Sequence, residues 1–233
     1  MGGLNNQAEN VVVQPTDGKI VVSGSSLDPG SSGVGIDHHT DLARYLPDGQ
    51  PDPAFGAGGT LTLDAFVGAD LALQPDGRLL LVGTADTTPP GSPPGSVTEL
   101  SVMRLEPDGA PDPTFGDNGT VNVSVTRLSS PSGVPGRDIG AAIALQPDGR
   151  IVVAGSTGGF NSNFAIARLL ADGTLDTDFT DTGVLTVDFF GFTDAAEAVA
   201  VTDDGRIVVA GLARDNVDGY GVARVSPQAA LRA

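Results

Sequence analysis

The stretch that decides the fold is Ala144 to Gly191, which reads ALQPDGRIVVAGS, then a short loop, then FAIARLLADGTLDTDF and finally TGVLTVDFFG. The runs IVVAG and FAIARL are short and apolar or β-branched, which is typical of strands. Asp-Gly stands between such runs, and it is a strong hairpin signal because both residues tolerate the backbone of a tight turn. The stretch therefore predicts a unit of four short antiparallel strands.

Variant copies of this unit fill nearly the whole chain. The first turn recurs at Gly18, Gly77, Gly149 and Gly205, and an arginine of the third strand recurs at Arg44, Arg104, Arg168 and Arg224. These arginines are 60, 64 and 56 residues apart. Four short strands repeated at one period are the signature of propeller blades, and a single small sheet needs neighbours on its faces to bury them. We predict one all-β β-propeller domain over residues 1–233, with blades at 8–66, 67–126, 139–191 and 192–226.

The fourth unit departs from the pattern. Where a Pro-Asp-Gly turn and a fourth strand should follow, the chain has only Ser226-Pro227 and a short tail. We therefore expect a last blade without its outer strand, in either a closed four-bladed ring or part of a larger propeller. An open arc would expose blade faces and form a homodimer or aggregate.

The units resemble the bacterial delta-60 repeat in the segments LQPDGRIVVAG, FAIARL and DGTLDTDF. The similarity covers nearly all of residues 8–225, although Thr180 stands where the first two units have Gly56 and Gly116. The resemblance implies a β-propeller fold and an extracellular or cell-surface bacterial protein, and it carries over no catalytic residues.

Composition excludes several classes of function. The formal net charge is −17, with one lysine beside eleven arginines, so the surface repels nucleic acid and anionic lipid. No window of 18 apolar residues predicts a membrane-inserted helix, and the N-terminus lacks the basic and apolar regions of a signal peptide. The absence of cysteine excludes disulfides, zinc–thiolate sites and cysteine nucleophiles.

Residues present in every copy are most simply structural. We expect the repeated arginines to form ion pairs within their blades with the aspartates eight residues later, rather than a ring of anion-binding cations. The phenylalanines after the second turn are expected to fill the space between blades. These residues are Asp52, Asp112 and Asp176, and Phe55, Phe115 and Phe179. Turns such as Asp48-Gly49-x-x-Asp52 resemble calcium loops but are shorter than an EF-hand, and we expect their aspartates to bind backbone amides.

Residues that differ between copies are better candidates for function. If the strands of each blade are labelled A to D from the channel outward, the variable B–C and D–A connections lie on one face, which we call the variable face. Its B–C loops are expected at 25–40, 84–96, 156–163 and 212–219, and its longest D–A loop at 127–138. Loops on rigid scaffolds carry function, so we expect a ligand here. The run 189–192 (FFGF) is expected to be mostly core, with one ring available to a sugar or a protein.

The most distinctive loop segment is 36–41 (IDHHTD), which holds both histidines of the chain. Its candidate metal ligands are Asp37, His38, His39 and Asp41, since imidazole and carboxylate together bind transition metals. Adjacent ligands point apart in an extended chain, so a metal site would need a turn here or a second loop. The alternative is an exposed polar loop without metal.

Two functions of different class follow from these features. The first is a non-enzymatic binding or scaffolding propeller that recognises a protein or glycan through the variable face. The alternative is a metal-assisted hydrolase or lyase with its site on the propeller axis or the variable face, which rests on analogy between folds. No cofactor is required by the first, whereas the second needs a divalent cation. No Gly-x-Ser-x-Gly motif supports a serine hydrolase.

Overall fold

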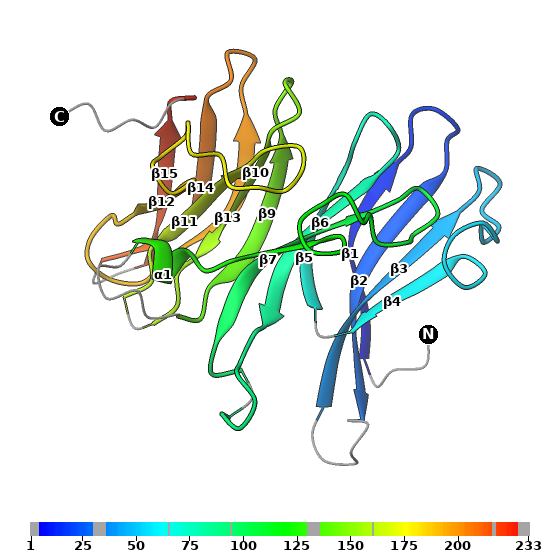
Figure 1. The fold of residues 1–233 in the computed structure, drawn as a ribbon, viewed down its shortest axis with the longest axis horizontal. Helices are drawn as coiled ribbons and strands as arrows, with labels where there is room; N and C mark the ends of the chain where they lie inside the picture. The colour runs from blue at the N-terminus through cyan, green and yellow to red at the C-terminus, as the bar shows by residue number, and fades with distance from the viewer. Residues whose placement is uncertain are drawn as a thin grey trace.

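The computed structural model describes residues 5–29, 36–64, 66–93, 95–129, 136–159, 161–215 and 218–227. Within these ranges the chain forms fifteen strands and one five-residue helix. The strands make four separate antiparallel sheets, of which three have four strands and the last has three. The predicted all-β propeller with an incomplete last unit is therefore confirmed, and the four sheets are shown in Figure 1.

Each sheet is a meander in which consecutive strands are neighbours. The first sheet contains β1 (Asn5–Val13), β2 (Ile20–Pro29), β3 (Ile36–Tyr45) and β4 (Thr60–Asp64). The second contains β5 (Phe66–Leu73), β6 (Leu79–Asp86), β7 (Thr98–Leu105) and β8 (Thr120–Val123), followed by helix α1 (Val125–Ser129). The third contains β9 (Ile139–Leu145), β10 (Ile151–Ser156), β11 (Phe164–Leu169) and β12 (Val184–Val187), and the last contains β13 (Asp194–Val201), β14 (Ile207–Arg214) and β15 (Asp218–Val225).

The sheets stack on one another in chain order. The first strands of consecutive sheets pack side by side, as β1 with β5, β5 with β9, and β9 with β13. Within the described ranges, β1 and β13, at the two ends of this series, do not pack side by side in this way, and the sheets form an open fan in Figure 1. Of the two arrangements left open by the sequence, the described residues therefore show the unclosed one.

Three apolar clusters lie between the sheets, one at each junction. The cluster between the second and third sheets joins Leu80, Val102 and Phe115 to Val153 and Leu169. Equivalent clusters fill the junction before it and the junction after it. Phe55, Phe115 and Phe179 are fully buried, and each cluster contains one of them. This confirms their predicted place in the core between the blades.

The repeated arginine lies at the same place in each of the first three sheets. In the second sheet, Arg104 Nε is 2.7 Å from Asp112 Oδ2, and its guanidinium carbon is 4.5 Å from the centre of the Phe115 ring. The same contacts recur for Arg44 and Arg168, with ion-pair distances of 2.8 Å. The predicted ion pair within each blade is therefore confirmed.

These arginines also reach across to the next sheet, which the sequence did not indicate. Arg44 Nη1 donates to the carbonyl of Pro107, Arg104 Nη1 to that of Ala171, and Arg168 Nη1 to that of Pro227. The three acceptors occupy one position of the repeat, just after the third strand of the following sheet. One buried side chain thus fixes both its own blade and the junction to the next.

A β-bulge explains the glycine that recurs within the second strand of every sheet. The pairing of the first and second strands shifts by one residue in all four sheets. The glycines opposite these shifts are Gly24, Gly83, Gly155 and Gly211. A Cβ atom at Gly155 would overlap the carbonyl oxygen of Ile139, and the other three would overlap the equivalent carbonyls. Only glycine permits this close approach of two backbones.

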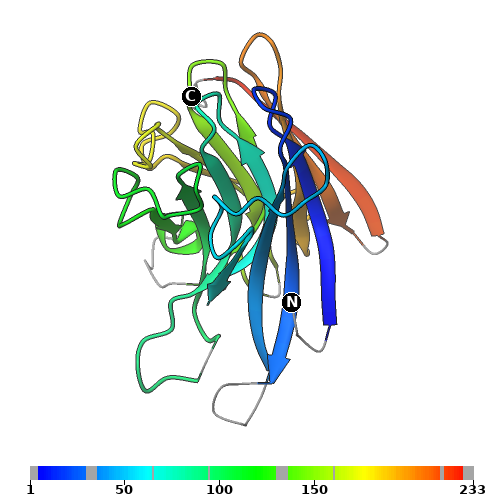
Figure 2. The same cartoon turned by 90° about the vertical axis from the view of Figure 1, so that its right-hand side faces the viewer.

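One predicted loop is largely strand. The sequence predicted a loop over 25–40, but β2 continues to Pro29 and β3 begins at Ile36, so most of this segment is a long hairpin ribbon (Figure 2). Backbone pairing needs no apolar side chains. This part of the sequence has no alternation of apolar and polar residues, so no pattern predicts its strands. After β8 the chain turns at once into α1, whose first residue, Val125, is buried.

Candidate functional site

The connections lie at two opposite ends of the sheets. The turns between first and second strands gather at the upper end in Figure 1, whereas the β6–β7 connection, the end of β2 and the start of β3 lie at the lower end. The upper end carries the repeated Asp-Gly turns, and the lower end is the variable face.

The predicted metal-ligand segment lies in the paired part of β3. His39 is opposite Asp64 of β4, and His39 Nδ1 is 3.1 Å from Asp64 Oδ1. Asp41 accepts a hydrogen bond of 2.6 Å from Thr62 Oγ1. The side chains of Asp37 and His38 lie outside the described residues, although the backbone pairs them with Asp28 and Leu27 of β2.

The described side chains show no completed metal centre. Within the described ranges, no three or more His, Cys, Asp or Glu side chains gather closely enough to hold a metal ion. Asp52, in the turn that resembles a calcium loop, is bound by Arg44, and Asp48 accepts the backbone N–H of Gln50 at 3.0 Å. The turn aspartates thus make the contacts expected of structural residues. The four-residue metal set stays a prediction.

The variable face presents two phenylalanine rings on the connection between the third and last sheets. Phe190 and Phe192 are 56% and 45% exposed. Phe189 is half-buried and packs edge-on against Phe164, with 5.0 Å between ring centres. The expectation of a mostly buried run with one available ring is therefore wrong in its number, because two of the three rings are exposed. The outward path of the connection after β12, rather than residue type, decides which rings face solvent.

This connection is held by hydrogen bonds to two aspartates. Asp188 Oδ1 accepts from Gly191 N at 2.6 Å, and Gly191 has a φ of 74°, which suits glycine. The buried Asp194 accepts from Phe189 N at 2.8 Å and from Arg214 N at 3.2 Å. We call residues 188–193 the aromatic turn. Its rings are carried by a backbone anchored at both ends.

A second buried carboxylate organises the neighbouring connection. Asp138 is fully buried and accepts the backbone N–H of Thr126 at 3.0 Å as well as the Thr126 hydroxyl. Burial raises the pKa of Asp138 above its ordinary value of 3.8, although these hydrogen bonds act in the opposite direction. Asp138 occupies the position of Asp194 one repeat earlier. Both aspartates tie loops of the variable face to the first strand of a sheet, which is a structural role.

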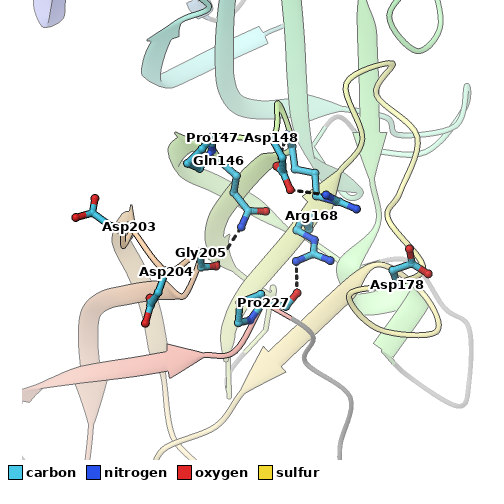
Figure 3. A pocket seen from close by; sticks show the side chains of 10 residues that line it. Gln146, Pro147, Asp148, Arg168, Asp178, Asp203, Asp204, Gly205 and Pro227 are labelled. Atoms are coloured by element: carbon cyan, nitrogen blue, oxygen red, sulfur yellow. Dashed lines mark hydrogen bonds and ion pairs between the residues drawn. The ribbon is translucent and has the colours of Figure 1, made fainter.

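A cavity of about 390 Å³ opens at the other end, between the turns of the third and last sheets. Figure 3 shows Gln146 donating to the carbonyl of Gly205, and Arg168 donating to that of Pro227, at its centre. Asp178 and Asp203 add carboxylates at its margin, and in Figure 3 both point away from the centre. The rest of the lining belongs to the repeated turns, so the cavity is a junction between blades with an acidic rim.

Asp178 and Asp203 are departures from the repeat that the sequence contained but that were not singled out. The equivalent positions hold Ala54 and Thr114 for the first, and Pro75 and Pro147 for the second. Comparing the copies residue by residue inside the turns, rather than only in the long loops, would have found them. Both side chains are exposed, so we interpret these two carboxylates as solvated surface charges.

The fold and the repeated junctions define this chain as a β-propeller protein. A family model described as a domain of unknown function (DUF5122) beta-propeller matches residues 16–55, 74–115 and 146–179. Each match runs from the first turn of a unit to its buried phenylalanine. The matches support a β-propeller family. No curated protein is similar enough to count as a relative.

Several solved structures resemble the whole chain at low identity. They include a xylan beta-1,4-xylosidase from Bacillus halodurans, with 14% identity and a TM-score of 0.48 over 97% of this chain and 42% of that one. A mannose phosphorylase from Leishmania mexicana has 12% identity and a TM-score of 0.49, over 97% and 66%. A glycosyl hydrolase from Bacteroides ovatus has 15% identity and a TM-score of 0.45, over 96% and 68%. The chain thus spans less than half the length of the xylosidase.

Within the described residues, none of the helices is long and apolar enough to cross a membrane.

Proposed function

We propose that this propeller is a binding module that recognises a protein or a glycan through its variable face, with the aromatic turn as its anchor. The observation that supports this proposal is the exposure of Phe190 and Phe192 on an anchored backbone. Aromatic residues, phenylalanine included, are enriched at protein interfaces relative to the rest of the surface.

The anchoring of the turn favours binding because it lowers the entropy lost when a ligand orders it. Asp188 and Asp194 fix the two ends of the turn, and Phe189 packs on Phe164 beneath it. A preorganised loop needs less of the interaction energy to become ordered. Phenylalanine has only two side-chain torsions, so the rings themselves lose little freedom on binding.

The finer features of the proposal rest on the repeat. We infer a delta-60 type of repeat, because the Asp-Gly turn, the Val-Val-x-Gly strand, the Ala-Arg strand and the Asp-x-x-Phe turn recur in order. That resemblance supports an extracellular or cell-surface location in bacteria. The net charge of −17 supports ligands other than nucleic acid and anionic lipid.

The test measures binding with and without the two rings. The chain, Phe190→Ser and Phe192→Ser are applied to a glycan array, and any hit is measured by calorimetry. Leu128→Ser, at an exposed apolar residue of α1 on the same face, tests whether any loss of binding is specific to the aromatic turn. Losing either ring should weaken binding by roughly ten-fold or more, because an aromatic anchor at an interface contributes at least 1–2 kcal/mol.

A protein ligand is tested by placing a photo-crosslinking phenylalanine analogue at position 190, with position 128 as control. Crosslinking to one bacterial surface protein from 190 alone would support the protein alternative. If no glycan binds in a manner dependent on Phe190 or Phe192, and position 190 crosslinks no more than position 128, the proposal is wrong.

The metal-assisted hydrolase or lyase is the second candidate, and the observation that favours it is the His39–Asp64 pair at 3.1 Å. Its test is the metal content of the protein after equilibration with zinc or manganese. Changing His38 and His39 together to alanine should abolish stoichiometric metal if the prediction holds. Equal metal content in the two proteins would remove this site.

A further inference from the structure

The two end sheets each leave one face uncovered, and these faces are the two halves of the junction that repeats inside the chain. At every internal junction, one sheet presents the side that carries the repeated arginine, which we call the tail side. The next sheet presents its opposite side, which we call the head side. Among the residues that the structure describes, no sheet packs against the head side of the first sheet or the tail side of the last sheet.

The head side of the first sheet is apolar and exposed. Val11 and Val13 of β1 are 64% and 60% exposed. In the second sheet the position of Val11 is Leu71, which is buried in the cluster of the first junction. In the third sheet it is Ile143, which is buried at the second junction. The head side of the first sheet therefore has the apolar residues that are buried in the second and third sheets, but here they are exposed.

The tail side of the last sheet is its counterpart. Tyr220 and Val222 of β15 are 96% and 63% exposed. The equivalent residues of the second sheet, Leu100 and Val102, are fully buried against the third sheet. Phe164 and Ile166 are likewise fully buried at the following junction. The last sheet thus continues the apolar pattern of the covered sheets.

Arg224 gives the direction of the missing contact. It occupies the position of Arg44, Arg104 and Arg168, which are buried and donate to a carbonyl of the next sheet. Arg224 itself is exposed. The residue of the first sheet that matches those acceptors is Pro47, directly after the third strand and Leu46.

A groove on the first sheet marks where Tyr220 belongs. It has a volume of about 280 Å³ and is lined at one end by Gln7 and Ala8 of β1. At the first internal junction, Thr40, which holds the position of Tyr220, bonds to Gly68 N at 2.7 Å. Gly68 holds the position of Ala8. The internal geometry therefore directs the Tyr220 ring to this end of the groove.

We propose that a second copy of this chain docks head to tail, with the tail side of its last sheet on the head side of the first sheet of its partner. Val222 and Tyr220 then cover Val11, Val13 and the groove, and the Arg224 guanidinium donates to the Pro47 carbonyl across the contact. The second copy is the occupant because the chain carries both halves of a junction that it already forms three times.

The contact is heterologous, which a mixing experiment can establish. Tyr220→Asp with Val222→Asp blocks the tail side, and Val11→Asp with Val13→Asp blocks the head side. Leu128→Asp is the matched charge control away from both. Light scattering and native mass spectrometry, from micromolar to about 200 μM protein, measure the mass in 0.3 M salt, which screens the repulsion between two chains of charge −17.

We expect the unaltered chain and Leu128→Asp to associate as the concentration rises, and each blocked variant alone to remain a monomer. An equimolar mixture of the two blocked variants should form a two-chain complex, because one intact head side and one intact tail side remain. Arg224→Ala should weaken the association roughly ten- to a hundred-fold, as expected for one charge-assisted hydrogen bond.

Three results would overturn the proposal. One is a monomeric unaltered chain at every concentration. Another is association of either blocked variant alone, which would indicate contact between like sides. The third is failure of the mixed variants to associate, when circular dichroism shows both to be folded. None of these readouts depends on Phe190 or Phe192, so the binding proposal and this one fail separately.

Discussion

Replacing Arg104 by alanine removes the side chain that joins the second sheet to the third. It abolishes the 2.7 Å ion pair with Asp112, the hydrogen bond to the Ala171 carbonyl and the contact with the Phe115 ring. Asp112 is fully buried, so its carboxylate cannot turn to solvent when its partner is lost. Breaking a buried ion pair by deleting one partner costs about 3–5 kcal/mol of unfolding free energy.

A neighbouring arginine moderates this loss. Arg78 Nε lies 3.0 Å from the same Asp112 oxygen, and Thr114 donates to the other oxygen from its backbone and its hydroxyl. Burial acts to raise the pKa of Asp112, but the Thr114 hydrogen bonds and the charge of Arg104 outweigh it and hold the pKa below 3.8. Since part of this support survives, we expect a loss of about 3 kcal/mol, at the lower end of the range.

The assay is urea unfolding followed by circular dichroism and by tyrosine fluorescence. Coincidence of the two transitions establishes that one free energy describes the change. The expected loss lowers the melting temperature by roughly 6–12 °C for a chain of this size. Arg206→Ala is the control, because Arg206 is half exposed and its ion pair with Asp204 is worth about 0–1 kcal/mol.

Arg104→Lys separates charge from geometry. Lysine keeps the positive charge but lacks the planar fork that bonds the carboxylate and the next sheet at once. We expect it to recover less than half of the loss. If Arg104→Ala is no more destabilising than Arg206→Ala, the junction does not depend on this side chain and the reasoning is wrong.

Three further predictions concern stability. The paired aspartates, such as Asp112, have pKa values below 3.8 in the folded protein. Their contribution to the free energy of unfolding is therefore complete above that pH and is lost as the pH falls through the folded pKa values. The melting temperature should decline steeply below about pH 4. Gly155→Ala forces a methyl group into a carbonyl and should cost about 1–3 kcal/mol, more than Gly49→Ala, which meets no atom and is strained only by its φ of 85°, as thermal melts will show. Thr40→Val leaves two buried polar groups of the first junction unpaired and should cost about 1–3 kcal/mol in urea unfolding.

The four sheets and their internal ion pairs were predictable because each rests on local chemistry that recurs. Asp-Gly fixes a turn wherever it occurs, and an arginine eight residues before an aspartate meets it across the same turn three times. The repetition itself supplied a comparison that one unrepeated sequence lacks. The glycine of the second strand was visible as a pattern, although its reason, the bulge opposite it, appears only in the paired strands.

The features that were missed depend on relations between segments. The β2–β3 ribbon runs through a mostly polar stretch of sequence, so no apolar period marks its strands. The exposure of Phe190 and Phe192 follows from where the chain turns after β12, which their residue type does not determine. Whether the sheets close into a ring depends on the small rotation between neighbouring sheets. The same contacts at each junction are compatible with rings of different blade number, so the sequence pattern does not decide closure.

The carbonyl contact of Arg104 with the next sheet also governs how the protein comes apart. In the described part of the chain, each sheet packs on its immediate neighbours in the series, so we expect unfolding to spread from one sheet to the next rather than to involve all sheets at once. The last sheet has one neighbour and one strand fewer, so its amide protons should exchange first. A force applied between the two ends would then separate the sheets one after another. At each junction the buried guanidinium of the repeated arginine would resist the separation.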